Sequence, residues 1–176
     1  LNLSGPICCE NGGVLWHPDW GETKYRADGS EAKRAAQWLA TQIDGLKWQG
    51  IETNQWRESE WCLSPNEDLE RIEKLIASSE WSHLSVVKTG FAIHLMEPQL
   101  SKGSGLQIIL KRMGLTADDL LCVGDAPNDL SMFDELQPPN FENENRNKPN
   151  LKKFETLELK NISFCYDNDK KSDRKS

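Results

Sequence analysis

One short apolar run restricts the folds open to this chain more than any other feature. Leu120-Leu121-Cys122-Val123 is continuously apolar and is followed at once by Gly124-Asp125. An unbroken apolar run of this length predicts a parallel strand that is covered on both faces. Helices predicted over 101–114 and 130–136 flank it, which is the alternation typical of an α/β fold. We therefore expect an α/β protein with a parallel sheet.

The N-terminal half carries signals for both strands and helices. A short strand within 3–15 is expected to run into the turn Asn11-Gly12-Gly13, because Asn and Gly tolerate positive φ. Apolar residues at helical spacing predict a helix over 30–44. Residues 46–63, rich in Trp, Ile and Thr, predict one or two strands.

Two further elements are expected before the apolar run. Ser64 as N-cap, Pro65 at the first helical position and Glu67 form a capping box, which predicts the start of a second helix. Residues 84–88 and 91–96 predict a hairpin around a Thr-Gly turn.

Composition excludes some partners. The net charge of −7 argues against a nucleic-acid or anionic-membrane surface, and no apolar run approaches the ~20 residues of a membrane span.

None of the five cysteines is paired at the spacing of a zinc knuckle or a redox motif, so we expect reduced thiols in a cytoplasmic protein. The sequence does not fix the oligomeric state, and a homodimer is one possibility. The chain opens with Leu1 rather than Met, and we expect an N-terminal segment to be missing.

The loop after the apolar run holds two carboxylates. Asp125 and Asp129 lie four residues apart at the carboxyl end of the expected strand, where open α/β sheets bind ligands. They could converge on Mg²⁺, which prefers oxygen ligands. The alternative is a structural loop with acidic N-capping residues, and spacing alone favours neither reading.

Lys102 stands at the start of the helix that precedes this run. A lysine beside a helix N-terminus suits a phosphate group, although most lysines at such positions are simply solvated. The lysine and the acid pair are separated by a single helix, and together they make a phosphate site more plausible than either does alone.

These motifs resemble those of the haloacid dehalogenase superfamily. The resemblance covers residues 1–136 and is carried by Asn11-Gly12-Gly13, Gly90-Phe91-Ala92-Ile93-His94, Lys102-Gly103 and the stretch from Gly124-Asp125 to Asn128-Asp129. It points to the cap-bearing branch that includes sucrose-phosphatase-like and archaeal-type phosphoglycolate phosphatases. The implied fold is part of a Rossmann-like core with a parallel sheet and an inserted α+β cap.

The resemblance implies roles for particular residues. Lys102 would hold the phosphoryl group, and Asn128 would contact it or order the loop. Asp125 and Asp129 would ligate Mg²⁺. Asn11 and Gly12 would form the hinge between core and cap. The resemblance implies four parts: the end of the first part of the core (1–13), the cap (14–98), the C-terminal part of the core (99–137) and a polar, disordered tail (138–176).

The chain also departs from the family pattern. The family's nucleophile lies in an Asp-x-Asp motif near the N-terminus, and nothing like it precedes Leu1. Asp167-Asn168-Asp169 follows no buried strand, and we reject it as nucleophile. We therefore assign no catalytic residue and expect the chain as given to be inactive.

The expected function is Mg²⁺-dependent hydrolysis of a small phosphorylated metabolite, foremost 2-phosphoglycolate. The alternatives are a sugar-phosphate phosphatase, an inactive remnant that binds phosphate or metal, and an α/β interaction domain. In the expected cap, we interpret five tryptophans as core packing rather than substrate stacking: Trp38, Trp48, Trp56, Trp61 and Trp81. We interpret Arg57 as a surface arginine rather than a partner of a substrate carboxylate, and His94 as an ordinary hairpin residue rather than a catalytic base.

Overall fold

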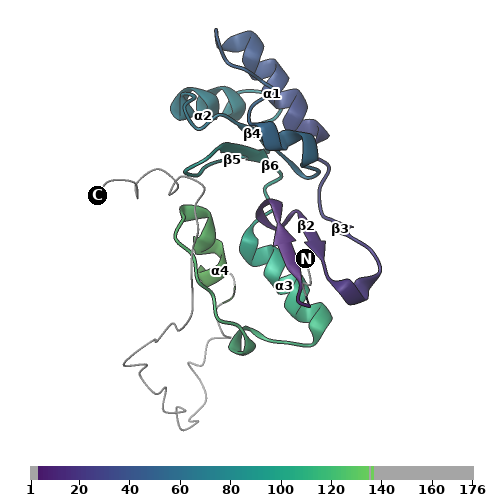
Figure 1. Cartoon of the computed structure of the whole chain (residues 1–176). Helices are drawn as coiled ribbons and strands as arrows, with labels where there is room; N and C mark the ends of the chain where they lie inside the picture. The colour runs from purple at the N-terminus through teal and green to yellow at the C-terminus, as the bar shows by residue number, and fades with distance from the viewer. Residues whose placement is uncertain (1–3, 135, 137–176) are drawn as a thin grey trace, which may run out of the picture. The chain divides into compact units, whose positions relative to one another are not determined.

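Two small antiparallel sheets organise the structure, a computed structural model that describes residues 4–134 and residue 136 (Figure 1). The first sheet has the order β1-β2-β3 and the second the order β4-β6-β5. The strands are β1 Ile7–Cys9, β2 Val14–Trp16, β3 Lys24–Tyr25, β4 Glu60–Leu63, β5 Ser85–Lys88 and β6 Ile93–Met96. The α-helices are α1 Ser30–Gln42, α2 Leu69–Ala77, α3 Lys102–Met113 and α4 Leu130–Asp134. Short 3-10 helices are η1 Glu10–Gly12, η2 Pro18–Trp20, η3 Glu52–Trp56, η4 Ala117–Asp119 and η5 Pro127–Asp129.

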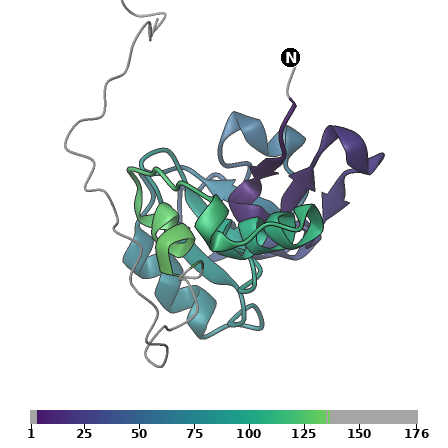
Figure 2. The ribbon, with the colours of Figure 1, turned by 90° about the horizontal axis from the view of Figure 1, so that it is seen from below.

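The first sheet packs against α3, which runs alongside its strands in Figures 1 and 2. The turn between β1 and β2 has positive φ at Glu10 (51°), Asn11 (51°) and Gly12 (85°), so the turn expected from Asn and Gly is confirmed. Gly105 of α3 allows a close approach, because a Cβ there would lie 2.8 Å from Gly12 Cα. The absence of side chains on both glycines thus brings the turn onto the first part of α3.

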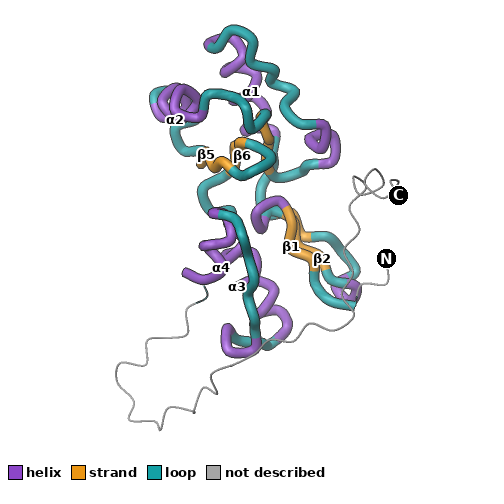
Figure 3. Tube along the Cα trace, turned by 60° about the vertical axis from the view of Figure 1, so that its left-hand side comes forward, coloured by secondary structure: helices purple, strands orange, loops and turns teal. Residues whose placement is uncertain are grey.

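The second sheet is covered on one face by α1 and α2, as Figures 1 and 3 show. Strand alternation directs Leu63, Ile93 and Leu95 toward these helices, where they pack with Leu39 and Ile72 in one hydrophobic core. All five side chains are fully buried. The opposite face therefore receives the intervening residues of β4 and β6.

Four of the tryptophans in the expected cap confirm the prediction of core packing. Trp38 and Trp81 have ring centroids 5.3 Å apart, Trp48 and Trp61 are stacked at 6.1 Å, and all four pack against the hydrophobic core. The prediction is wrong for Trp56, which is 67% exposed at the end of η3.

The second helix begins later than expected. Ser64 caps only a turn, accepting a hydrogen bond from the Asn66 N–H at 3.3 Å. The helix starts at Leu69, and Asp68 is its N-cap, accepting from the Arg71 N–H at 3.1 Å. A carboxylate at this position both satisfies an unpaired N–H group and interacts favourably with the helix dipole, which explains why Asp68 prevails over the serine.

This assignment predicts the outcome of two alanine substitutions. Asp68→Ala is expected to lower the free energy of unfolding by ~1 kcal/mol, because it removes the N-cap of α2. Ser64→Ala, the matched control, should have a smaller effect. Urea denaturation followed by circular dichroism measures both, and a larger loss from Ser64→Ala would contradict the observed helix start.

The helices that flank the apolar run are confirmed, but the strand between them is not. Ser101 caps α3 and Gly114, at φ 68°, ends it, while α4 begins at Leu130. Residues 120–123 form no strand, and Leu121 and Val123 are 87% and 82% exposed. A strand needs a neighbour to satisfy its backbone groups, and within the described residues none pairs with this run. Both described sheets are antiparallel.

Parts of the expected organisation remain predictions. The boundary expected after Gly13 falls within the β1–β2 hairpin, where Cys9 pairs with Val14, so residues on its two sides share one sheet. The tail 138–176 and a strand expected at 157–166 lie outside the described residues. None of the helices in the described part of the chain is long and apolar enough to cross a membrane.

Candidate functional site

The structure brings Lys102 and Asp129 together. Lys102 is the first residue of α3, and its Nζ lies 2.5 Å from Asp129 Oδ1. The Lys102 side chain is 33% exposed and that of Asp129 only 8%. The pair thus joins the start of α3 to the loop before α4, as the phosphate-site hypothesis requires.

Asp129 also closes the loop that carries Asp125. Its Oδ2 accepts hydrogen bonds from the N–H groups of Asp125 (3.1 Å) and Ala126 (3.0 Å). Gly124 permits this close folding, because a Cβ there would lie 2.4 Å from Asp129 Cβ. The hydrogen bond from Lys102, followed by that from the Ala126 N–H, holds the pKa of Asp129 below its ordinary value, so this side chain is a carboxylate at neutral pH.

The loop has the oxygen donors that Mg²⁺ requires. A carboxylate offers about four lone-pair sites, and Asp129 uses three of them for Lys102 and two backbone N–H groups. Asp125 is exposed and leaves a second carboxylate open to a cation. Among the described residues, Asn128 Oδ1 is buried without a hydrogen-bond donor, a position that a water of a hydrated cation could fill. These residues therefore fit Mg²⁺.

Asn128 and Asn11 connect this loop to the turn between β1 and β2. Asn128 Nδ2 donates to Asn11 Oδ1 at 3.0 Å, and Asn11 is 7% exposed. Asn11 Nδ2 in turn donates to Glu60 Oε2, at 2.9 Å, in β4. One amide side chain thus contacts both the acidic loop and the second sheet.

Gly12, expected with Asn11 to form a hinge, is tightly enclosed. Its carbonyl oxygen accepts from the Arg26 guanidinium at 2.8 Å, and a Cβ on Gly12 would lie 2.1 Å from the Ser101 carbonyl oxygen. The turn is therefore held against the N-cap residue of α3, next to Lys102. Its role as a hinge stays a prediction.

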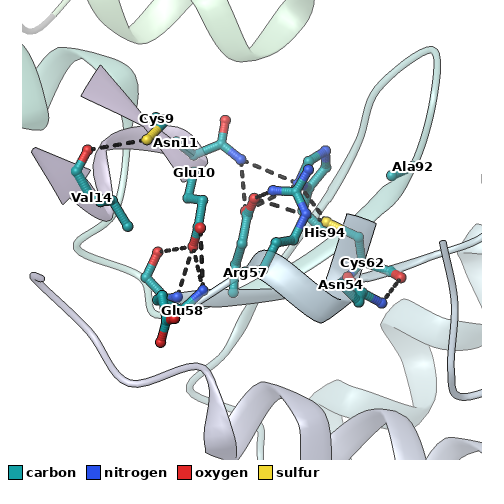
Figure 4. A network of polar contacts seen from close by, with 12 residues as sticks. Cys9, Glu10, Asn11, Val14, Asn54, Arg57, Glu58, Cys62, Ala92 and His94 are labelled. Carbon is teal, nitrogen blue, oxygen red and sulfur yellow. Dashed lines mark hydrogen bonds and ion pairs between the residues drawn. The ribbon is translucent and has the colours of Figure 1, made fainter. Parts of the chain in front are cut away.

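A buried polar cluster on β4 and β6 was missed by the sequence analysis (Figure 4). Figure 4 shows Asn11, Arg57, Cys62 and His94 directed toward one another. Arg57 is not a surface residue, since its side chain is 15% exposed and pairs with fully buried Glu60. His94, 2% exposed, is not an ordinary hairpin residue, because it contacts Glu60 Oε2 through Nδ1 at 3.1 Å.

Two opposing effects act on the pKa of Glu60. Burial raises it, but hydrogen bonds from His94 and Asn11 and the charges of His94 and Arg57 outweigh burial and leave the pKa below its ordinary value. Burial raises the pKa of the Cys62 thiol, so this side chain is protonated at neutral pH. The period of two along β4 was the signal that could have identified the cluster, since it places Glu60 and Cys62 on one face.

Comparisons with known proteins agree with the motifs at this site. Residues 61–138 match the family model of the haloacid dehalogenase-like hydrolases. The chain is 33% identical over 135 residues to a phosphoglycolate phosphatase of Haloarcula marismortui, covering 76% of this chain and 58% of that protein. A phosphoglycolate phosphatase of Methanothermobacter thermautotrophicus is 32% identical over 134 residues, with 76% and 57% covered. The chain thus spans less than two thirds of the length of these relatives.

Solved structures support the same relationship. The crystal structure of Thermoplasma acidophilum 0175 superposes with a TM-score of 0.65 at 25% identity, covering 75% of this chain and 56% of that one. A Streptococcus mutans protein of 21% identity, with a TM-score of 0.52 and coverages of 70% and 59%, shares the fold. The α/β fold class is therefore confirmed, and residues 61–138 of the chain belong to the haloacid dehalogenase-like hydrolases.

Proposed function

We propose that the protein containing this chain is a Mg²⁺-dependent phosphomonoester hydrolase and that its substrate is 2-phosphoglycolate. The observation that carries the proposal is the contact between Lys102 and Asp129, which brings an ammonium group and a carboxylate together from positions 27 residues apart. The names of the curated relatives support the substrate. A sugar phosphate is the alternative, because selectivity depends on the shape of the pocket around the leaving group.

Each residue of the site has a task in the proposed reaction. The Lys102 ammonium would offset negative charge on the phosphoryl oxygens, the main protein contribution to phosphoryl transfer. Asp125 and Asp129 would hold Mg²⁺, which supplies further charge neutralisation when bound. Asn128 would orient the loop through Asn11. The attacking aspartate, whose aspartyl-phosphate would be hydrolysed by water, is proposed to come from a segment outside these 176 residues.

The metal assignment predicts a specific effect of Asp125→Asn. Measured on the protein expressed from its full reading frame, this change should raise the Mg²⁺ concentration for half-maximal hydrolysis of an aryl phosphate by about 10-fold or more, because even outer partners of metal ligands contribute that much to affinity. Asp118→Asn, an exposed acid of η4, is the matched control and should leave the Mg²⁺ dependence unchanged. Unaltered Mg²⁺ dependence in Asp125→Asn would refute the assignment.

A second candidate function is binding of phosphate and Mg²⁺ without turnover. It is favoured by the lack, among the described residues, of an Asp-x-Asp motif after a strand. A panel of phosphorylated metabolites distinguishes the candidates. Preferred hydrolysis of 2-phosphoglycolate supports the first proposal, preferred hydrolysis of a sugar phosphate supports its alternative, and binding without hydrolysis of any compound supports the second.

A further inference from the structure

Three potential metal ligands converge on the face of the second sheet opposite α1 and α2. Cys62 of β4 and His94 of β6 are cross-strand partners, and Glu60 lies two residues before Cys62 on the same face. None of the three is more than 2% exposed. A carboxylate oxygen, a sulfur and a ring nitrogen all lie within 4.8 Å of one another.

Two separations between these atoms are close to the edges of a tetrahedral metal site. His94 Nδ1 lies 3.1 Å from Glu60 Oε2 and 3.3 Å from Cys62 Sγ, and Cys62 Sγ lies 3.9 Å from the other carboxylate oxygen, Glu60 Oε1. Zinc bonds of about 2.3 Å to sulfur and about 2.0–2.2 Å to nitrogen or oxygen place tetrahedral ligands roughly 3.3–3.6 Å apart. The Glu60 carboxylate would turn so that a single oxygen faces the ion together with Cys62 Sγ and His94 Nδ1.

The surroundings of His94 also suit a ligand. Thr89 Oγ1 donates to the Ala92 carbonyl oxygen at 3.3 Å and can therefore accept from His94 Nε2–H at 3.1 Å. This hydrogen bond would leave the Nδ1 lone pair directed at the other two ligands, the arrangement usual for metal-bound histidines. Asn11 Nδ2 also lies 3.3 Å from Nδ1, so three polar groups surround a nitrogen that can form one in-plane bond.

We propose that Glu60, Cys62 and His94 bind a divalent transition metal of the zinc class. A set of one carboxylate, one thiolate and one imidazole is suited to such an ion and not to Mg²⁺, which prefers oxygen alone. On binding, the Cys62 S–H bond and the His94 Nδ1–H bond break, sulfur–metal and nitrogen–metal bonds form, and both protons pass to solvent. The two negative ligands then balance the charge of the ion, and Arg57 continues to pair with the carboxylate.

The nearest opening to this site lies beside Arg57. A pocket of about 330 Å³ is lined by residues that include Arg57, whose guanidinium pairs with the buried Glu60 carboxylate. The site is distinct from the loop that carries Asp125, and its occupancy does not depend on phosphatase activity. A second group of similar ligands, partly buried Glu31 and Glu97 with exposed His83, is an alternative location for a zinc-class ion among the described residues.

Cobalt titration of the metal-free 176-residue chain tests the proposal. One equivalent of Co²⁺ is expected to give the d–d bands of a tetrahedral site together with a thiolate-to-cobalt charge-transfer band, and Zn²⁺ should remove both. Tetrahedral bands without the thiolate band would place the ion at a site lacking cysteine and would overturn the proposal. No stoichiometric binding would overturn it as well.

Variants and labelling locate the ion. Cys62→Ser and His94→Gln should weaken Co²⁺ binding at least about 10-fold, whereas Cys9→Ser and His83→Ala, the matched controls, should not. In the wild-type chain, at a urea concentration that opens the buried Cys62 thiol to alkylation in the absence of metal, Zn²⁺ should protect Cys62 and leave exposed Cys9 reactive, a result that requires no folded variant. Equal alkylation of Cys62 with and without Zn²⁺ would refute the site.

Discussion

Replacing Lys102 with alanine is expected to lower kcat/KM for an aryl phosphate by about 10²–10³-fold, the loss typical when one preorganised charge-stabilising group is removed. The ammonium is positioned before any substrate arrives, because Lys102 begins α3 and its Nζ is held by Asp129. Steady-state kinetics of the protein expressed from its full reading frame, at saturating Mg²⁺, measures the effect.

Lys111→Ala is the matched control for this substitution. Lys111 lies in the last turn of the same helix, is exposed, and should leave kcat/KM unchanged. Since Lys102 also pairs with Asp129, the Mg²⁺ dependence should be measured in parallel. A loss that disappears at high Mg²⁺ would show that Lys102 acts on the metal loop and not on the phosphoryl group, and an undiminished kcat/KM would exclude both roles.

The second large effect concerns stability. Gly12→Ala is expected to lower the free energy of unfolding by about 2–6 kcal/mol, from about 1–3 kcal/mol for a non-glycine residue at positive φ and about 1–3 kcal/mol for overpacking. The new Cβ would lie 2.1 Å from the Ser101 carbonyl oxygen, so the backbone must move. Urea denaturation of the 176-residue chain measures the change.

Gly90→Ala is the control for Gly12→Ala, because a Cβ on Gly90 meets no atom within 4 Å. It should change the free energy of unfolding by less than about 1 kcal/mol, since exposed substitutions away from special features have small effects. A Gly12→Ala protein as stable as Gly90→Ala would mean that the turn and the start of α3 are not held together as the structure describes.

Local patterns along the chain were sufficient for several elements. The spacing of apolar residues placed α1 and α3 to within two residues. Ser101 and Gly114 marked the ends of α3 because helix caps depend on hydrogen bonds and backbone angles of residues close by in the chain. The start of α2 was misplaced because Ser64, Pro65 and Glu67 match a local capping pattern, whereas the helix is capped four residues later by Asp68, whose carboxylate also interacts favourably with the helix dipole.

The strand expected at 120–123 shows a different limit. An apolar run records that a segment is suited to burial, but a strand forms only beside another strand that accepts its hydrogen bonds. Within the described residues no such neighbour exists, and Leu121 and Val123 remain exposed. The pattern therefore identified an apolar segment but did not predict whether it forms a strand or is buried.

The sequence by itself determined the acidic loop, the lysine at the start of a helix and the left-handed turn, since each depends on neighbouring residues and on motifs of fixed spacing. Only the tertiary structure decided that Lys102 contacts Asp129, that Asn11 joins the loop to Glu60, and that Arg57 is half-buried and His94 buried. These contacts join residues distant in the chain, and the free energy that selects them comes from packing two sheets with their helices, which no local pattern records.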